Sequence, residues 1–316
     1  MSVSFKYLPF GIEVEFTGMP RKRSAEICAA YFGTEVEKDL GQKYPRGCQR
    51  YDVKDERDRI WKLVYEDSIF AEPSRYTCRV ELVSPICQYE DLTRIKFLVM
   101  ALKQQGLMKV NPSCGFHVHV DGALFDAKTL RNLVNLVAGK EALLYKALQV
   151  DDKREQRFCK KVNREFLEAI NEGKPDTLEA FRDIWYSTLK AECEYPEQTR
   201  YYGLNLHSFF ANGSIEYRMF NGTCEPERIN AMIILSLAMS AYALNREQIL
   251  YRKTEPVQEK RAFSAWLSQL GLVGKEFQKT RRLLVENLGG KPDVLDLKLQ
   301  KQLSKDQAWK QIVDWI

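Results

Sequence analysis

The sequence predicts an α+β fold: a mainly antiparallel β-sheet with helices on one face and an open, polar face on the other. Segments with apolar residues at helical spacing alternate with short segments of strand-like alternation. Two strand segments, 201–206 and 214–220, flank Ala-Asn-Gly, which is typical of a hairpin turn between antiparallel strands. Several strands carry ionisable residues at every second position, and such residues point to one face of a sheet. The polar face is therefore the place where a functional site is expected.

The N-terminal part of the chain alternates short strands with helices. The first helix, over 24–33, is expected to begin with Ser24 as its N-cap and to stop at Gly33. Residues 39–58 are rich in Gly, Gln, Arg, Asp and Lys and predict a long exposed loop, which inside a compact domain is usually functional or mobile. The other elements expected here are strands over 10–17, 61–66 and 78–84 and a helix over about 90–105.

The C-terminal part is richer in helix. From about residue 255 charged and apolar residues alternate at helical spacing, broken by Gly271 and Gly274, so a helical tail is expected. The elements before it are a strand over 114–121, helices over 127–150 and about 177–193, strands over 201–206 and 214–220, and a helix over about 226–251.

Composition and charge are those of an ordinary globular protein. The 316 residues are 45% hydrophobic and 29% charged, and the net charge of +5 favours an anionic ligand without proving one. The most apolar stretch, 229–244, is shorter than the roughly 20 residues that span a bilayer, so it predicts a buried helix and no membrane segment. The eight cysteines form no Cys-x-x-Cys pair and the N-terminus has no signal-peptide pattern. We therefore expect a reduced, cytoplasmic protein with free thiols.

Four strand segments place ligand-type residues on one face of the sheet. Carboxylates are the natural ligands of Mg²⁺ and Mn²⁺, because these hard cations prefer oxygen. In each segment the intervening residues are apolar and would point into the core. The ligand-type residues are Glu13 and Glu15 in Gly-Ile-Glu-Val-Glu-Phe, Glu81 in Val-Glu-Leu-Val, His117 and His119 in Phe-His-Val-His-Val, and Glu216 with Arg218 in Ile-Glu-Tyr-Arg.

This constellation points to metal and phosphate chemistry. Converging carboxylates without a cation would repel one another and raise each other's pKa, and two bound metal ions would remove that repulsion. The same ions would neutralise the charge that develops during phosphoryl transfer. His117 offers a neutral imidazole nitrogen, and Arg218 would project beside the ions with a guanidinium suited to a phosphate oxygen.

Each motif alone also has a structural interpretation. Exposed glutamates are common on edge strands, a His-x-His pair also occurs in zinc hydrolases, and Glu216 with Arg218 fits a cross-strand salt bridge. The whole set on alternating strands favours the metal–phosphate interpretation. His207 stands alone and is interpreted as structural, and Cys114 as a packing residue.

The charged motifs follow one another in a definite order along the chain: Gly11-Ile-Glu-Val-Glu-Phe16, Asp67-Ser68, Val80-Glu-Leu-Val-Ser-Pro85, Cys114-Gly-Phe-His-Val-His-Val-Asp121, Arg200-Tyr-Tyr-Gly-Leu-Asn205 and Ser214-Ile-Glu-Tyr-Arg218. This ordered set resembles the putative amidoligase family of the carboxylate–amine ligase superfamily, with glutamine synthetase and glutamate–cysteine ligase. The resemblance covers roughly residues 8–245. The chain departs from the family at Asp67-Ser68-Ile69, where the family often has Asp-Gly-Ser, so the geometry after Asp67 is left open.

The resemblance implies the fold of glutamine synthetase and the guanido kinases. It also implies an amidoligase-like catalytic domain over 1–245 with a helical extension over 246–316 packed on it. It gives Glu13 and Glu15 one metal site each. The other implied roles are metal binding for Asp67, Glu81, His117 and Glu216, nucleotide or substrate binding for His119, Arg200, Asn205 and Arg218, and catalysis for Arg218, Glu216 and Arg200.

The implied activity is an ATP-dependent carboxylate–amine ligase that makes an amide or isopeptide bond through an acyl phosphate, with ATP and Mg²⁺ or Mn²⁺ as cofactors. Its partners would be an amino acid or other carboxylate and an amine acceptor, which is a small molecule, a peptide or a modified nucleic acid. Three alternatives stay open: a kinase of the same fold acting on a guanidino or carboxyl group, a metal-dependent hydrolase using His117 and His119, and a non-catalytic binding protein. The oligomeric state cannot be read from the sequence, and an oligomer is compatible with it.

Overall fold

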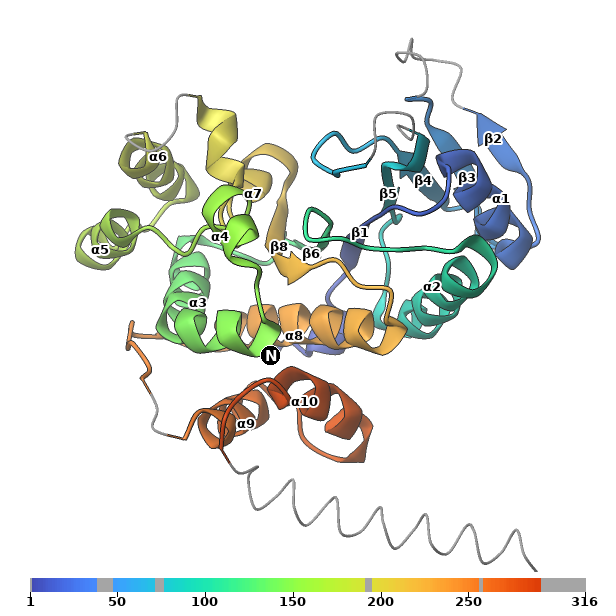
Figure 1. Cartoon of the computed structure of the whole chain (residues 1–316). Coiled ribbons are helices and arrows are strands. Elements are labelled where there is room, and N and C mark those ends of the chain that lie inside the picture. Colours follow the sequence, from blue (N-terminus) through green and yellow to red (C-terminus); the bar gives the residue numbers. More distant parts are fainter. Residues whose placement is uncertain (1, 39–47, 72–76, 191–194, 256–257, 291–316) are drawn as a thin grey trace, which may run out of the picture.

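The computed structural model describes residues 2–38, 48–71, 77–190, 195–255 and 258–290. An eight-stranded, antiparallel sheet with the order β2-β3-β4-β5-β1-β6-β8-β7 lies at its centre (Figure 1). The predicted α+β class is thus confirmed. The strands are β1 (Phe10–Phe16), β2 (Val36–Lys38), β3 (Tyr51–Lys54), β4 (Ile60–Val64), β5 (Val80–Val83), β6 (Gly115–Asp121), β7 (Leu204–Asn205) and β8 (Ser214–Asn221).

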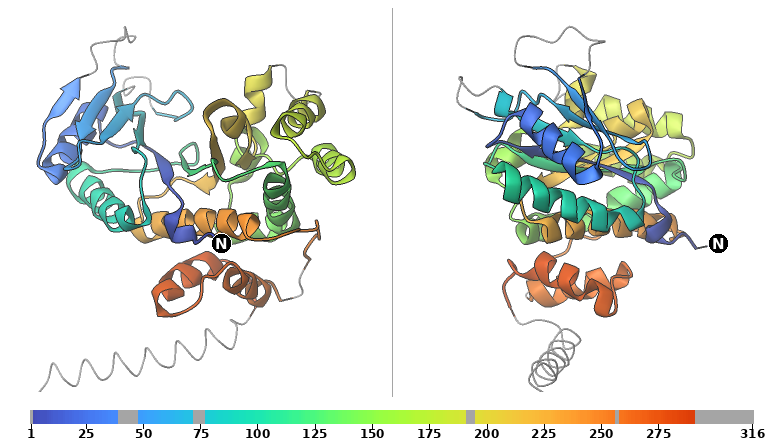
Figure 2. Two further views of the ribbon diagram at one scale, coloured as in Figure 1. Left: turned by 180° about the vertical axis from the view of Figure 1, so that it is seen from behind. Right: turned by 90° about the vertical axis from the view of Figure 1, so that its right-hand side faces the viewer.

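Helices cover one face of this sheet. Helices α1, α3 and α8 pack against its strands, and α2 packs beside α1 and α8. Helix α10 packs on α8 and α3, so the C-terminal helices form a further layer on the side of α8 away from the sheet (Figure 2). The helices are α1 (Arg21–Phe32), α2 (Leu92–Gly106), α3 (Ala127–Leu148), α4 (Asp152–Arg157), α5 (Arg164–Gly173), α6 (Leu178–Leu189), α7 (His207–Asn212), α8 (Pro226–Leu244), α9 (Glu259–Gln269) and α10 (Gln278–Val285).

The central strands alternate between core and open face, as their sequences predict. In β1 the side chains of Phe10, Ile12 and Val14 are buried against the helices. In β6 the same is true of Phe116 and Val118. Because neighbouring residues of a strand point to opposite faces, the charged residues between them lie on the opposite face, where Glu15 and His117 are also buried.

The first helix begins earlier than the sequence predicts. It runs from Arg21, and its N-cap is Pro20, whose backbone is extended. Ser24 is not the N-cap: it lies inside the helix and its hydroxyl donates to the carbonyl oxygen of Pro20 at 3.1 Å. A serine in the first turn can satisfy itself in this way without ending the helix. The predicted stop at Gly33 is confirmed, since its φ of 70° is in the left-handed region.

The predicted loop over 39–58 is partly wrong. Residues 39–47 lie outside the described residues, but Tyr51–Lys54 form strand β3, which pairs with β2 and β4. The buried side chain of Val53 faces the core opposite Trp61 of β4. Charged neighbours in the sequence hid this strand, because only one of its faces is buried.

The C-terminal part differs from the prediction in its connections. Strand β7 has only two residues, and the short helix α7, ended by Gly213 at a φ of 77°, replaces the expected hairpin turn before β8. Helices α4 and α5 were not predicted, and α8 ends at Leu244 rather than near 251. In the expected helical tail the structure has α9 and α10, while residues 291–316 lie outside the described part. None of the helices in the described ranges is long and apolar enough to cross a lipid bilayer.

Candidate functional site

Strand pairing brings the predicted ligand residues together on the open face of the sheet. The four strands that carry them, β5, β1, β6 and β8, are neighbours in the sheet. Residues directly opposite each other on antiparallel strands have their Cβ atoms about 5 Å apart. The cross-strand pairs are Glu15 with Glu81, Glu13 with His117, and Glu216 with His119.

Two groups of side chains in this cluster have the spacing of metal ligands. One group is Glu13, His119 and Glu216, and the other is Glu13, Glu81 and His117. Within each group the ligand atoms all lie within 4.8 Å of one another. Glu13 belongs to both groups, so one carboxylate joins two potential ion positions. We call these five residues the ligand cluster.

Glu15 lies beside the second group but is held by the backbone. Its Oε2 accepts a hydrogen bond from the N–H of Gly115 at 2.6 Å, and its Oε1 lies 3.6 Å from Nε2 of His117. Its side chain is buried. The arrangement therefore differs from the expectation of one metal site each for Glu13 and Glu15, because Glu13 contributes to both groups.

The two histidines are oriented as metal ligands usually are. Nδ1 of His117 lies 2.8 Å from Oε2 of Glu13, and Nδ1 of His119 lies 3.1 Å from the hydroxyl of Ser214. Among the described residues the buried Nε2 atoms of both rings have no hydrogen-bond partner. In metal sites one ring nitrogen is commonly fixed by a carboxylate or hydroxyl while the other binds the ion. Carboxylate oxygens with imidazole nitrogens suit Mn²⁺ or Mg²⁺.

Burial and mutual repulsion disfavour the ionisation of one carboxyl group of the cluster. Burial raises the pKa of Glu81 well above its usual value, and the negative charges of Glu13 and Glu15 raise it further. Burial would raise the pKa of Glu13 too, but its interactions with His117 and His119 hold it well below the usual range. A cation bound among these carboxylates would relieve the repulsion that the histidines offset only in part.

Glu216 is fixed by two partners from the same end of the sheet. Nη1 of Arg218 donates to its Oε1 at 2.5 Å, and Nδ2 of Asn205 donates to its Oε2 at 2.6 Å. Burial would raise the pKa of Glu216, but the charges of Arg218, His119 and His117 together outweigh it and the pKa is lowered. Both Glu216 and Arg218 are buried, so this guanidinium sits at the edge of the ligand cluster in a fixed orientation.

The structure does not bring Asp67 to the ligand cluster. Its side chain is 87% exposed and accepts hydrogen bonds from Tyr65 and Arg79. The negative charge of the preceding residue, Glu66, contributes to the raised pKa of Glu81. Sequence reasoning missed Glu66, although it follows the alternation of the strand that ends at Val64.

Arg200 also lies apart from the ligand groups. It ends the 3₁₀-helix Pro196–Arg200, is exposed, and has its guanidinium 5.9 Å from the ring centre of Tyr201. Its charge acts on His207 and, after desolvation, contributes to the lowered pKa of that histidine. His207 itself accepts or donates a 2.9 Å hydrogen bond with the hydroxyl of Tyr186, in keeping with a structural role.

A cavity of about 660 Å³ opens beside the cluster. Glu13 and His119 line it, together with Gly11, Lys62 and Ser214 among others. Gly11 occupies the same face of β1 as Glu13, and a Cβ there would meet only ordinary contacts at 3.8 Å or more. Because Gly11 has no side chain, this part of the cavity wall stays open. The cavity volume is typical of a small-molecule site.

The chain is similar to one family of known proteins. A family model described as "Putative amidoligase enzyme" matches residues 6–240. A solved structure described as a bifunctional glutathione synthetase from Pasteurella multocida aligns with a TM-score of 0.39 and 11% identity, over 90% of this chain and 47% of that chain. This chain thus spans about half the length of that protein, and so distant a likeness supports no argument about activity. No curated protein matches the sequence.

Proposed function

The chain belongs to the putative amidoligase family, and from this membership we propose that it is an ATP-dependent ligase that joins a carboxylic acid to an amine. The observation that carries the proposal is the pair of ligand groups that share Glu13, with the guanidinium of Arg218 at their edge. Carboxylates that converge on one face with two free imidazole nitrogens fit a pair of divalent ions, and a neighbouring guanidinium fits a phosphate. A site for ATP with two divalent ions needs both of these: ligands for the ions and a donor for the phosphate.

The proposed reaction has two steps. A carboxylate oxygen of the acid attacks the γ-phosphorus of ATP, the bond from that phosphorus to the bridging oxygen breaks, and ADP leaves. The amine nitrogen then attacks the carbonyl carbon of the acyl phosphate, the carbon–oxygen bond to phosphate breaks, and the nitrogen loses a proton. Forming the acyl phosphate provides a leaving group, which a free carboxylate lacks.

The residues of the open face divide this work. Mg²⁺ or Mn²⁺ held by the ligand cluster would supply the charge that offsets the phosphate oxygens. Arg218 would donate to an oxygen of the transferred group from a position that Glu216 fixes, which is stabilisation by a preorganised donor. Asn205 holds the other oxygen of Glu216 and acts as a positioning residue.

The cavity beside Glu13 and His119 is the proposed place of the acid or the amine, because it adjoins the cluster and part of its wall is open. We propose the catalytic domain over residues 1–245, which contains the residues that the family model matches. Residues 246–316 are then an extension, of which α9 and α10 lie in the described part. No residue of α9 or α10 belongs to the two ligand groups, which fits a role outside the chemistry.

The test is release of ADP from ATP with Mg²⁺ or Mn²⁺ and pools of amino acids, with and without amines. The native chain is compared with Glu13→Gln, which removes one carboxylate charge from both ligand groups. A matched control is Glu247→Gln, because the side chain of Glu247 is 91% exposed and pairs only with Lys128 in the described part of the chain. We expect ADP release that needs both an acid and an amine, and that is lost in Glu13→Gln alone.

Other outcomes separate the alternatives. ADP release that needs an acceptor but no amine would identify a kinase of the same fold. Conversion of a substrate without ATP would point to a hydrolase that uses His117 and His119. If the native chain binds no ATP in the presence of either metal ion, the ligase proposal is wrong.

A further inference from the structure

A second guanidinium lies next to the ligand cluster, and it has no anionic partner in the described part of the chain. Arg154 projects from the short helix α4 and is only 3% exposed. Its Nη1 and Nη2 donate to the carbonyl oxygens of Ser113 and Phe220 at 3.3 and 3.4 Å, which are long hydrogen bonds. Its buried Nε has no hydrogen-bond partner, and no described carboxylate pairs with it. A buried charge without a counter-charge is costly, so the structure calls for an anion here.

The place of this guanidinium follows from Gly115. A Cβ on Gly115 would lie 2.5 Å from Nη2 of Arg154 and 2.8 Å from Nε2 of His117. Gly115 and His117 are two residues apart on β6 and share the open face of the sheet. Since Gly115 has no positive φ, a tight turn does not explain the glycine, and the missing side chain is what lets the guanidinium approach the strand. Arg154 therefore lies on the face of the ligand cluster, beside a free imidazole nitrogen.

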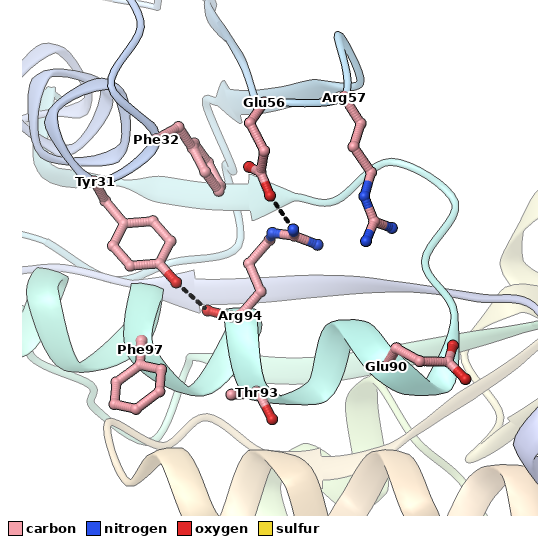
Figure 3. A pocket seen from close by; sticks show the side chains of 8 residues that line it. All are labelled: Tyr31, Phe32, Glu56, Arg57, Glu90, Thr93, Arg94 and Phe97. Atoms are coloured by element: carbon pink, nitrogen blue, oxygen red, sulfur yellow. Dashed lines mark hydrogen bonds and ion pairs between the residues drawn. The ribbon is translucent and has the colours of Figure 1, made fainter.

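The other arginines near the open face and around the second cavity differ in this respect. Arg218 is already paired with Glu216. Arg94, which lines a separate cavity of about 460 Å³ between α1, α2 and the turn after β3, is paired with Glu56 (Figure 3) and with Asp91. Arg154 differs from both because it is buried and forms no ion pair with a described carboxylate.

We propose that Arg154 binds an oxyanion of a substrate of this site, either a phosphate of ATP or the carboxylate of the acid. The inference rests on the proposed function and adds a residue that neither the family resemblance nor the sequence pattern assigns. A guanidinium presents several N–H groups in a fixed plane and can bind two oxygens of a phosphate or carboxylate at once. Arg154 approaches the cluster from α4 and Arg218 from β8, so the bound anion would have a guanidinium from each of two elements.

The test compares Arg154→Met with Arg157→Met, a matched control from the same helix whose side chain is exposed. Binding of ATP with Mg²⁺ and the KM for the acid are measured separately, because they distinguish the two oxyanions. We expect Arg154→Met to weaken one of them roughly tenfold to a hundredfold, as the loss of a charge-assisted hydrogen bond does. Arg157→Met should match the native chain. Methylguanidinium added to the medium should restore part of the turnover of Arg154→Ala, which a purely structural role would not allow.

Native affinities for both substrates and native turnover in a folded Arg154→Met would overturn the inference. If that variant does not fold, Arg154→Lys replaces it: lysine keeps the charge but loses the planar fork, so binding should still fall, and unchanged binding would overturn the inference. If the native chain binds no ATP, the proposed function fails first. Inorganic phosphate then tests Arg154 on its own, because phosphate should raise the melting temperature of the native chain more than that of Arg154→Lys, and equal shifts would refute the role.

Discussion

Two regions of this molecule bury several charges close together, and they differ in how those charges are matched. We call the first region the Asp91 network. In it the carboxylate of Asp91 accepts hydrogen bonds from both Nη atoms of Arg59, at 2.8 and 3.0 Å, and forms an ion pair with Arg94. Arg59 also pairs with Asp55, and Arg94 with Glu56 (Figure 3). In the ligand cluster, by contrast, carboxylates repel one another and two buried imidazole nitrogens make no hydrogen bond to a described residue.

The contrast shows which of the two regions needs a ligand. The charges of the Asp91 network satisfy one another, so its role is to join the turn after β3 to the start of α2. The ligand cluster has imidazole nitrogens without a hydrogen bond and carboxylates that repel one another, so a bound cation is needed to compensate its negative charge. Both regions contain many charged groups, so the number of charges does not distinguish them. The presence of buried polar atoms without a hydrogen-bond partner does.

The largest expected effect is in the network that we regard as structural. Asp91→Ala would leave two half-buried arginines, Arg59 and Arg94, without the buried carboxylate that they share. Breaking a fully buried pair costs roughly 3–5 kcal/mol, and the loss here is expected at the lower end of that range because each arginine keeps a second carboxylate partner. Urea denaturation measures the loss, with Arg57→Met as a control, because Arg57 is 54% exposed and lies 3.6 Å from the same carboxylate. The control should change stability by less than about 1 kcal/mol. Loss of metal or ATP binding in a folded Asp91→Ala would contradict the division between the two regions.

A third kind of buried carboxylate sharpens the comparison. Burial raises the pKa of Glu141 to about 8, and its carboxyl accepts a hydrogen bond from the N–H of Val162 and forms no ion pair with a cation in the described part of the chain. The folded state keeps this proton up to about pH 8, while the unfolded chain releases it near the usual value of 4.5. Stability from this group is therefore complete below about pH 4.5 and is lost as the pH rises to about 8, by roughly 1 kcal/mol per pH unit.

Denaturation of the native chain and of Glu141→Gln at several pH values between 5 and 9 measures this contribution. The difference between the two free energies of unfolding should change in favour of the variant as the pH rises, because glutamine keeps the acceptor and cannot ionise. A difference that stays constant with pH would show that Glu141 is ionised in the folded protein.

A smaller effect is expected in the ligand cluster itself. Glu81→Gln replaces a buried carboxyl group whose ionisation the charges of Glu13 and Glu15 oppose, so the metal-free variant should be as stable as the native chain or more stable by about 1 kcal/mol. The same change should abolish most of the rise in melting temperature that Mn²⁺ gives the native chain. Glu247→Gln serves again as the exposed control. A destabilised variant that keeps the full response to Mn²⁺ would mean that Glu81 is structural.

The smallest effect distinguishes two neighbouring carboxylates. Glu66→Gln should weaken Mn²⁺ binding a few-fold, because the charge of Glu66 reaches Glu81. Asp67→Asn should change it little, since the side chain of Asp67 is 87% exposed and turned to Arg79. Calorimetric titration of both variants with Mn²⁺ makes the comparison, and the reverse order of effects would restore the role that the family resemblance gives to Asp67.

Strand periodicity explains why the sequence predicts which charged residues share one face of the sheet. Glu13, Glu81 and Glu216 lie on the same face because alternation in a strand determines the side to which a residue points. Periodicity does not report which strands are neighbours, so the sharing of Glu13 between two groups could not be predicted. That sharing depends on β1 lying between β5 and β6.

The remaining misses have local causes. Strand β4 ends at Val64, and although its alternation continues to Glu66, the resemblance gives the role to the neighbouring Asp67, whose side chain is exposed. Helix α4 has a charged sequence that reads as fully exposed, although Arg154 on it is buried. The burial of a single arginine leaves no periodic pattern in the sequence. It becomes visible only from the packing of α4 near Gly115.

The shared position of Glu13 has a thermodynamic consequence for any pair of ions bound here. Two ions that draw on one carboxylate are linked, so the affinity measured for the second depends on whether the first is present. A titration should then deviate from the curve for two independent and identical sites. Replacing Glu81 or Glu216 should weaken one of the two equilibria more than the other, whereas replacing Glu13 should weaken both and remove the linkage between them.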